Sequence, residues 1–270
     1  MSKPSCEIFH KHILFFVCNI VFSVNTENID KHMKMNWMKT CWQDLIMATY
    51  EIDVEAIQEY VPVGFELDLF QGKALISVVA FRFNNTYLAG VKMPCYRDFP
   101  EINLRIYVKG IHDGEMRRGV VFIKELIPHH IPALIARKLF RENFHVQPVE
   151  VTRYGEKNCE RIIYEWGGGN KLGGEVKMPL VDWQEETEEK FLGDNYWAFK
   201  KAGKKTYAFR VNHKPWKMAK LENVDISIDL EGLYGKRIAN AIKKYGIEPR
   251  NTFYIDGSTV ELGLPKRVLN

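Results

Sequence analysis

The sequence lacks the short motifs by which many catalytic and metal-binding sites are recognised. It has no C-x-x-C pair, no H-E-x-x-H helix, no G-x-S-x-G elbow and no glycine-rich loop with phosphate-binding spacing. Zinc knuckles, zinc proteases, hydrolases with a nucleophile elbow and nucleotide-binding loops are therefore not indicated. We predict no metal and no cofactor.

Cysteine is also scarce. The five cysteines are Cys6, Cys18, Cys41, Cys95 and Cys159, an odd number spread far apart. This spacing indicates no disulfide framework, and reduced thiols are the simplest interpretation. We therefore predict a cytoplasmic protein.

Neither sign of charge dominates. The 38 Lys and Arg residues and 34 Asp and Glu residues leave a net charge of +4, and the two signs are interleaved. The nearest approach to a basic stripe is the short stretch KAGKKTY, Lys201–Tyr207. This balance predicts a soluble protein and argues against a nucleic-acid partner.

The only long apolar run lies near the amino terminus. Ile13–Val24 is almost wholly apolar and follows Lys3 and Lys11. It is shorter than the ~20 residues that span a bilayer, but it suits the h-region of a signal peptide, which would imply export. Alternatively, the true start is Met33, Met35 or Met38. We predict that residues 1–36 are a non-globular extension and that 37–270 form one domain with no membrane partner; the oligomeric state stays open.

Strand patterns dominate the globular part. The predicted strands are Ala74–Phe83, Ile102–Val108, Gly119–Ile127, Arg161–Trp166, Gly174–Met178, Thr206–Val211, Val224–Leu230, Thr252–Ile255 and Thr259–Leu262, the last two joined by a turn at 256–258. The predicted helices are Val54–Tyr60, Ile131–Asn143, Thr187–Tyr196 and Leu233–Tyr245. Many strands and few helices predict a mainly β (α+β) fold: a single closed, cone-shaped antiparallel β-barrel with flanking helices.

The stretch EINLRIYVKG, Glu101–Gly110, alternates polar and aliphatic residues. Period two predicts a strand with one buried aliphatic face. The polar face either meets water or lines a cavity. Glu101 and Arg105 lie on that face, about 13 Å apart at the rise of a strand, so each needs a partner elsewhere or a ligand between them.

Four other residues are candidates for a binding site. Lys124 and Glu125 are adjacent in an apolar strand, so one of them faces inward unless a bulge intervenes. A buried Lys124 could form a Schiff base; the alternative is an exposed Lys124 beside an inward Glu125. Arg137 could hold a carboxylate bidentately or lie on the surface. His213 could act as an acid or base, although packing against Trp216 is the commoner role.

Several stretches resemble the YqjF-like family within the acetoacetate decarboxylase-like superfamily. They lie at Thr40–Asp53, Val61–Phe81, Phe99–Val108, Arg117–Pro128, Ala136–Phe140, Asn195–Phe199, His213–Trp216 and Leu233–Gly235. The resemblance implies a closed cone-shaped barrel around a small-molecule cavity, with Arg137 carried over and Glu101 similar to a cavity acid.

The decarboxylases use a Schiff-base lysine beside a second lysine. Phe144 and His145 stand about where this pair belongs, and neither can form an imine. We therefore expect a small-molecule ligand, an organic acid or a carbonyl compound, held without that lysine pair. The binding candidates are Glu101, Arg105, Lys124, Glu125, Arg137 and His213. Two alternatives stay open: a non-catalytic module with a filled barrel, and a lyase that uses Lys124.

Overall fold

The computed structural model describes residues 37–93, 95–156 and 159–268. These residues form a mainly β structure with few helices, as predicted. The expected extension, residues 1–36, lies outside the described residues.

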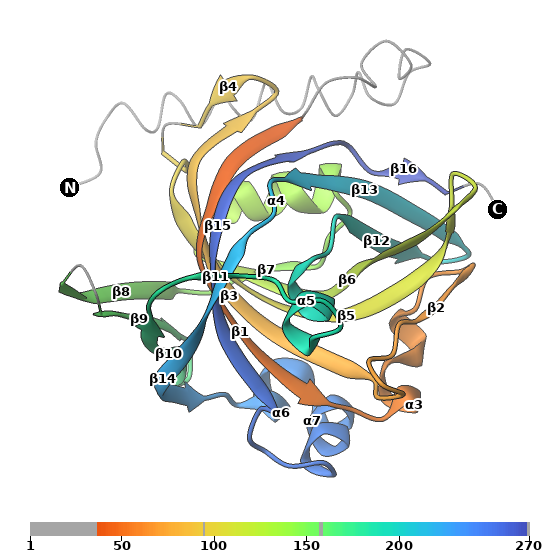
Figure 1. Ribbon diagram of the computed structural model, residues 1–270. Helices are drawn as coiled ribbons and strands as arrows, with labels where there is room; N and C mark the ends of the chain where they lie inside the picture. Colours follow the sequence, from red (N-terminus) through yellow and green to blue (C-terminus); the bar gives the residue numbers. More distant parts are fainter. Residues whose placement is uncertain (1–36, 94, 157–158, 269–270) are drawn as a thin grey trace.

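Seven strands form a ring of pairings (Figure 1). They are β1 (Met38–Glu51), β3 (Leu75–Leu88), β5 (Phe99–His112), β6 (Glu115–Ile127), β12 (Trp197–Ala202), β13 (Lys205–His213) and β15 (Asn251–Leu262). Each pairs with the next, and β15 pairs with β1.

One pairing of this ring departs from the predicted antiparallel sheet. Strand β12 runs parallel to β6, and the short strand β7 (Phe144–Val146) also runs parallel to it. A chain that returns through a helical connection can re-enter the sheet in the same direction. Helix α4 (His130–Leu139) precedes β7 and α5 (Glu188–Gly193) precedes β12, so these connections account for both parallel pairs.

The remaining strands extend or cover the ring. They are β2 (Phe65–Leu67), β4 (Val91–Lys92), β8 (Val149–Glu156), β9 (Cys159–Trp166), β10 (Asn170–Lys177), β11 (Val181–Asp182), β14 (Lys217–Ser227) and β16 (Lys266–Arg267). The other helices are α3 (Val54–Ile57), the 3-10 turn Gln58–Tyr60, α6 (Leu230–Tyr234) and α7 (Lys236–Lys243). Strands β8, β9, β10 and β14 form an antiparallel arm that projects to one side (Figure 1).

Two predicted features near the carboxyl end are wrong. The predicted helix 233–245 divides at Gly235 into α6 and α7. The turn predicted at 256–258 is absent, because β15 continues through it. A Cβ at Gly257 would lie 2.1 Å from the carbonyl oxygen of Trp42 in β1, so this glycine permits close approach of two strands.

Strand β5 is buried on both faces. Its aliphatic residues, among them Ile102 and Leu104, pack with α6 and α7 in one hydrophobic cluster. Its polar face points the opposite way, where Tyr107 joins a second cluster formed by residues from the ring strands, α4 and α5. The polar residues Glu101, Asn103 and Arg105, together with Tyr107, therefore face the interior of the ring.

Two cysteines fall within the part of the chain that the structure describes with side chains. Cys41 is a free thiol and Cys95 is disulfide-bonded. The prediction of reduced thiols throughout is therefore wrong for Cys95. None of the described helices is long and apolar enough to cross a membrane.

Closure of the ring between β6 and β12 leaves no room for a side chain at Gly119. A Cβ there would lie 2.4 Å from the carbonyl oxygen of Trp197 and 2.8 Å from the ring of Phe199. We predict that Gly119→Ala lowers the free energy of unfolding by about 1–3 kcal/mol through overpacking. Urea denaturation measures this change. Gly263→Ala is the matched control, because a Cβ there meets open space; equal losses in both variants would contradict the prediction.

Candidate functional site

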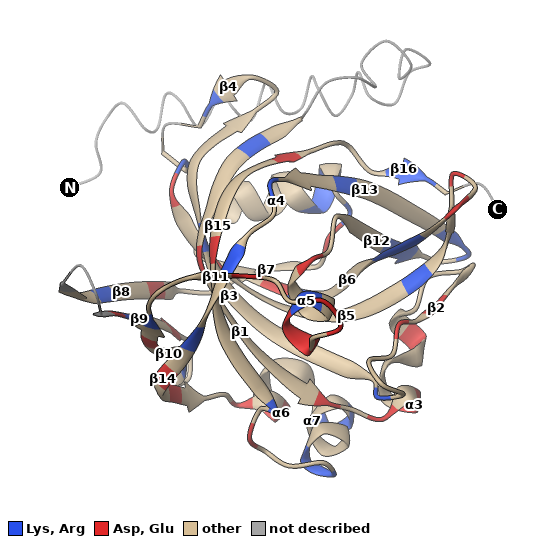
Figure 2. Ribbon diagram, viewed as in Figure 1, with Lys and Arg blue, Asp and Glu red and all other residues tan. Residues whose placement is uncertain are grey.

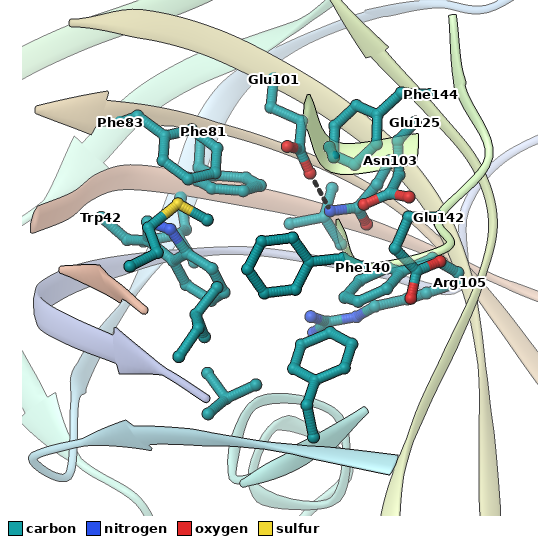
Figure 3. A pocket seen from close by; sticks show the side chains of 18 residues that line it. Trp42, Phe81, Phe83, Glu101, Asn103, Arg105, Glu125, Phe140, Glu142 and Phe144 are labelled. Atoms are coloured by element: carbon teal, nitrogen blue, oxygen red, sulfur yellow. Dashed lines mark hydrogen bonds between the residues drawn. The ribbon is translucent and has the colours of Figure 1, made fainter. Parts of the chain in front are cut away.

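A cavity lies inside the ring (Figure 3). Its volume is about 60 Å³, several times the roughly 10–15 Å³ that one water needs by the same measure. Apolar and aromatic side chains form most of the wall: Met38, Trp42, Leu45, Val79, Phe81, Phe83, Phe122, Ala136, Phe140, Phe144, Phe209, Val211 and Leu262. Its polar lining consists of Glu101, Asn103, Arg105, Glu125 and Glu142.

Strand β5 supplies three of these polar residues because side chains at every second position share a face. Glu101, Asn103 and Arg105 reach into the cavity in succession (Figure 3). Glu101 is 2 % exposed and Arg105 9 % exposed. The polar face of this strand is thus a cavity wall.

A β-bulge in β6 decides which neighbouring charge faces inward. The register shifts between Leu104, opposite Lys124, and Arg105, opposite Phe122. The shift inserts one extra residue into β6. Because of it, Phe122 and Glu125 both face the cavity, and Lys124 faces the other side of the sheet. There the Lys124 Nζ donates to the carbonyl oxygen of Leu233 in α6, 2.6 Å away.

The third carboxyl group of the cavity, that of Glu142, lies in the turn after α4. Arg141 has a φ of 59°, a left-handed conformation that redirects the chain where the helix has ended. The Asn143 side chain donates to the carbonyl oxygen of Ile123 at 2.8 Å, and its own carbonyl accepts from the Glu125 amide at 3.1 Å. These bonds fix the turn against β6 and place Glu142 in the cavity wall.

Glu125 and Glu142 both line the cavity, and both side chains are buried. Burial makes it costly for two neighbouring carboxyl groups to ionise together, and the charge of Glu142 contributes to the raised pKa of Glu125. Lys200 of β12 adds a positive charge, with its Nζ 3.0 Å from the Glu142 Oε2. This charge opposes the effect of burial on Glu142 and favours its ionised form.

Burial raises the pKa of all three cavity carboxyl groups. The pKa of Glu101 rises to about 8, chiefly through desolvation, although a hydrogen bond from Asn103 opposes the rise. Desolvation also raises the pKa of Glu142 to about 7 against the opposing charge of Lys200, and that of Glu125 well above its ordinary value. Near pH 7, Glu101 therefore keeps its proton, and burial favours the protonated form of Glu125.

Arg105 has no acidic counterpart. Its Nη2 donates to the carbonyl oxygen of Leu192 at 3.0 Å, and its Nε donates to the Tyr107 hydroxyl at 3.4 Å. Within the described ranges, no Asp or Glu oxygen lies within 4.0 Å of its guanidinium. The cavity thus contains a buried positive charge that no carboxylate neutralises directly.

Three oxygen atoms at the cavity have no hydrogen-bond partner. Asn103 donates through Nδ2 to Glu101 at 3.1 Å, but its Oδ1 is unpartnered. The Glu125 Oε2 and the Glu142 Oε1 are also unpartnered. Buried polar atoms in native proteins nearly always have partners, so these atoms require an explanation such as a ligand or ordered water.

Three of the predicted binding residues lie elsewhere. Lys124 faces away from the cavity, as described above. Arg137 is exposed on α4, and its Nε donates to the carbonyl oxygen of Phe144 at 2.7 Å. His213 stacks on Trp216 with ring centroids 3.7 Å apart and on Tyr196 at 4.5 Å, and burial lowers its pKa.

The sequence reasoning missed Asn103, Glu142 and Lys200. Asn103 could have been predicted as a cavity residue, because it lies between Glu101 and Arg105 on the same alternating face. Glu142 follows a helix and Lys200 lies on a strand that was not predicted, so no periodic pattern marks either. Among the residues that the structure describes, no group of three His, Cys, Asp or Glu side chains is arranged to hold a metal ion.

The sequence matches a family described as an uncharacterized conserved protein, DUF2071, over residues 39–255. It is 28% identical over 202 residues to the uncharacterized protein YqjF of Bacillus subtilis, which covers 71% of this chain and 78% of YqjF.

Solved structures share the fold. Acetoacetate decarboxylase from Legionella pneumophila has a TM-score of 0.59 at 12% identity, covering 86% of this chain and 87% of its own. An acetoacetate decarboxylase-like enzyme from Sphingomonas wittichii has a TM-score of 0.57 at 14% identity, with coverages of 87% and 94%. The enduracididine biosynthesis enzyme MppR complexed with pyruvate has a TM-score of 0.57 at 11% identity, with coverages of 86% and 91%.

The raised carboxyl pKa values predict that stability falls as the pH rises. Between pH 4.5, the ordinary value, and about 8, the folded protein keeps the Glu101 proton while the unfolded chain loses it. Because the folded state then binds more protons, the free energy of unfolding decreases across this range. We predict that Glu101→Gln flattens this decrease, measured by urea denaturation at a series of pH values. Glu55→Gln, at an exposed position, leaves the slope unchanged; identical slopes in all three proteins would contradict the prediction.

Proposed function

The chain belongs to the DUF2071 family, and from this premise we propose that its cavity binds a small organic acid, such as a short keto acid. In this proposal the seven-strand ring is a closed, cone-shaped barrel that excludes water from the ligand. Binding proceeds without a Schiff-base lysine.

The uncompensated charge of Arg105 carries the proposal. A buried cation is costly unless an anion accompanies it. Glu101 holds its proton near pH 7, burial favours the protonated form of Glu125, and the Lys200 ammonium is ion-paired with Glu142. One positive charge therefore remains at the cavity, and a ligand carboxylate is the complementary group, since a guanidinium binds carboxylates bidentately.

The protonated acids favour a second functional group on the ligand. A carboxyl group that keeps its proton at neutral pH can donate a hydrogen bond to a carbonyl oxygen. Glu125 and Glu142 each direct an unpartnered oxygen to the cavity. A carbonyl group beside the ligand carboxylate would use such a donor, and the aromatic wall would pack against the short carbon chain.

The cavity volume limits the ligand to a few non-hydrogen atoms. The pyruvate complex of MppR is a precedent for a short keto acid in a protein of similar fold. At 11% identity this likeness concerns the fold alone, so the choice of ligand for this chain rests on its own charges.

We predict that short keto acids, with pyruvate and 2-oxobutyrate as the first probes, raise the unfolding midpoint of the full chain in a concentration-dependent way. A ligand that binds only the folded state stabilises it by mass action. Replacing Arg105 with Met should weaken binding about 10- to 100-fold, because hydrogen bonds to charged groups contribute roughly 1.5–3 kcal/mol. Thermal-shift titration and calorimetry measure both effects.

The matched control is Arg210→Met, which removes an exposed arginine from β13. It should keep the full ligand response. Equal affinity in the Arg105 and Arg210 variants, or no stabilisation of the wild type by any short organic acid, would exclude this proposal.

The lyase alternative makes a different prediction. Lys124 donates to a backbone carbonyl on the opposite face of the sheet, and Lys200 is ion-paired to Glu142. We therefore expect that borohydride added with pyruvate or acetoacetate yields no covalent adduct, as read by intact mass. A borohydride-dependent adduct at either lysine would reverse the conclusion that binding is non-covalent.

A further inference from the structure

The Glu125–Glu142 pair has the geometry of an acid–base couple. Glu142 uses Oε2 for Lys200 and leaves Oε1 unpartnered; Glu125 leaves Oε2 unpartnered. The two residues are 3 % and 5 % exposed, and both line the cavity. Glu142 is therefore bound to Lys200 through one oxygen, and each carboxyl group keeps one oxygen without a partner.

The surrounding charges and the burial favour an ionised Glu142 and a protonated Glu125. Glu101 and Arg105 face it from β5, and Lys200 approaches from β12. Lys200 favours the ionised form of Glu142, and the loss of water disfavours a second negative charge on Glu125. A base and an acid thus lie side by side at one wall.

We propose that Glu125 and Glu142 catalyse enolisation of a bound keto acid, a proton transfer between the carbon next to the ketone and the ketone oxygen. This inference rests on the proposed function, because Arg105 must first hold the carboxylate of the substrate. It adds a reaction to a site for which binding alone was proposed.

The step conserves protons and electrons. The Glu142 carboxylate removes a proton from the carbon next to the carbonyl group, and that C–H electron pair becomes the C=C bond. The C=O π electrons form a new O–H bond with the proton that Glu125 gives up. Glu142 gains one proton and Glu125 loses one, and passage of a proton from Glu142 back to Glu125, both of which line the cavity, restores the starting state.

One cation outside the cavity lining contacts this pair: the fold holds the Lys200 ammonium beside Glu142. Lys200 does not line the cavity and acts as a positioning residue, which holds the negative charge on Glu142. Its removal should change the pH at which the base becomes protonated without removing the base itself.

Hydrogen–deuterium exchange tests the inference directly. Pyruvate and 2-oxobutyrate are incubated in D₂O with the full chain, and proton NMR follows the loss of the signal from the carbon next to the ketone. We expect the wild type and Glu55→Gln to accelerate this loss over buffer. Glu125→Gln and Glu142→Gln should each slow the catalysed exchange at least about 100-fold, the usual contribution of general acid–base catalysis, while thermal shifts still report binding.

The pH profile supplies a test that requires no folded glutamine variant. On the acid side, the wild-type exchange rate should fall as Glu142 takes up a proton, near pH 7. Lys200→Met should move this limb to higher pH, because loss of a positive charge favours the protonated carboxyl. A profile that is unchanged by Lys200→Met would overturn the assigned roles.

The outcomes separate the two proposals. If a keto acid stabilises the protein but exchanges at the buffer rate, or if both glutamine variants exchange like the wild type, the enolisation proposal fails and binding stands. If none of the short keto acids stabilises the protein, binding and enolisation both fail.

Discussion

Close packing of β6 against β12 closes the seven-strand ring around the cavity. At Gly119 the two strands come so near that even a methyl group would collide with the carbonyl oxygen of Trp197. This contact completes the ring, and only a complete ring can keep the polar face of β5 away from water. The raised pKa values of the cavity acids follow from that exclusion, since desolvation is their largest cause.

Irregular backbone, rather than regular strand, delivers the chemistry (Figure 3). The bulge in β6 turns Glu125 inward and Lys124 outward, and the turn at Arg141 brings Glu142 beside it. Bulges and left-handed residues carry a local cost and are common near functional sites. Here they join two carboxyl groups with a lysine from β12. Figure 2 shows further Lys and Arg residues along β12 and β13, and those at Lys201, Lys205 and Arg210 are exposed.

The sequence predicted the family and the mainly β fold, and it identified the strand that forms the cavity wall. Period-two alternation in EINLRIYVKG was sufficient to predict strand β5, because the strand is regular and buried on both faces. The pattern failed at β1, where Asp44, with a φ of 56°, interrupts the apolar run, and at β15, where Gly257 resembled a turn. Glu142 and Lys200 could not be found, because their proximity depends on a loop conformation and on the parallel β6–β12 pairing. Lys124 and Glu125 were treated as alternatives for the residue that faces inward, and only the bulge in β6 decides that this residue is Glu125.

Ring closure buries three carboxyl groups and the Arg105 guanidinium at one cavity, and this burial favours the protonated form of the acids. Carbon-13 NMR of protein labelled at the glutamate carboxyl carbons measures this most directly, because each carboxyl signal moves as its proton leaves. We expect one glutamate to titrate near pH 8, with its signal missing in Glu101→Gln, and two further glutamates to titrate above pH 4.5, with one of these signals missing when Glu125 or Glu142 is replaced. Titration of every glutamate near the ordinary value of 4.5 would contradict this expectation.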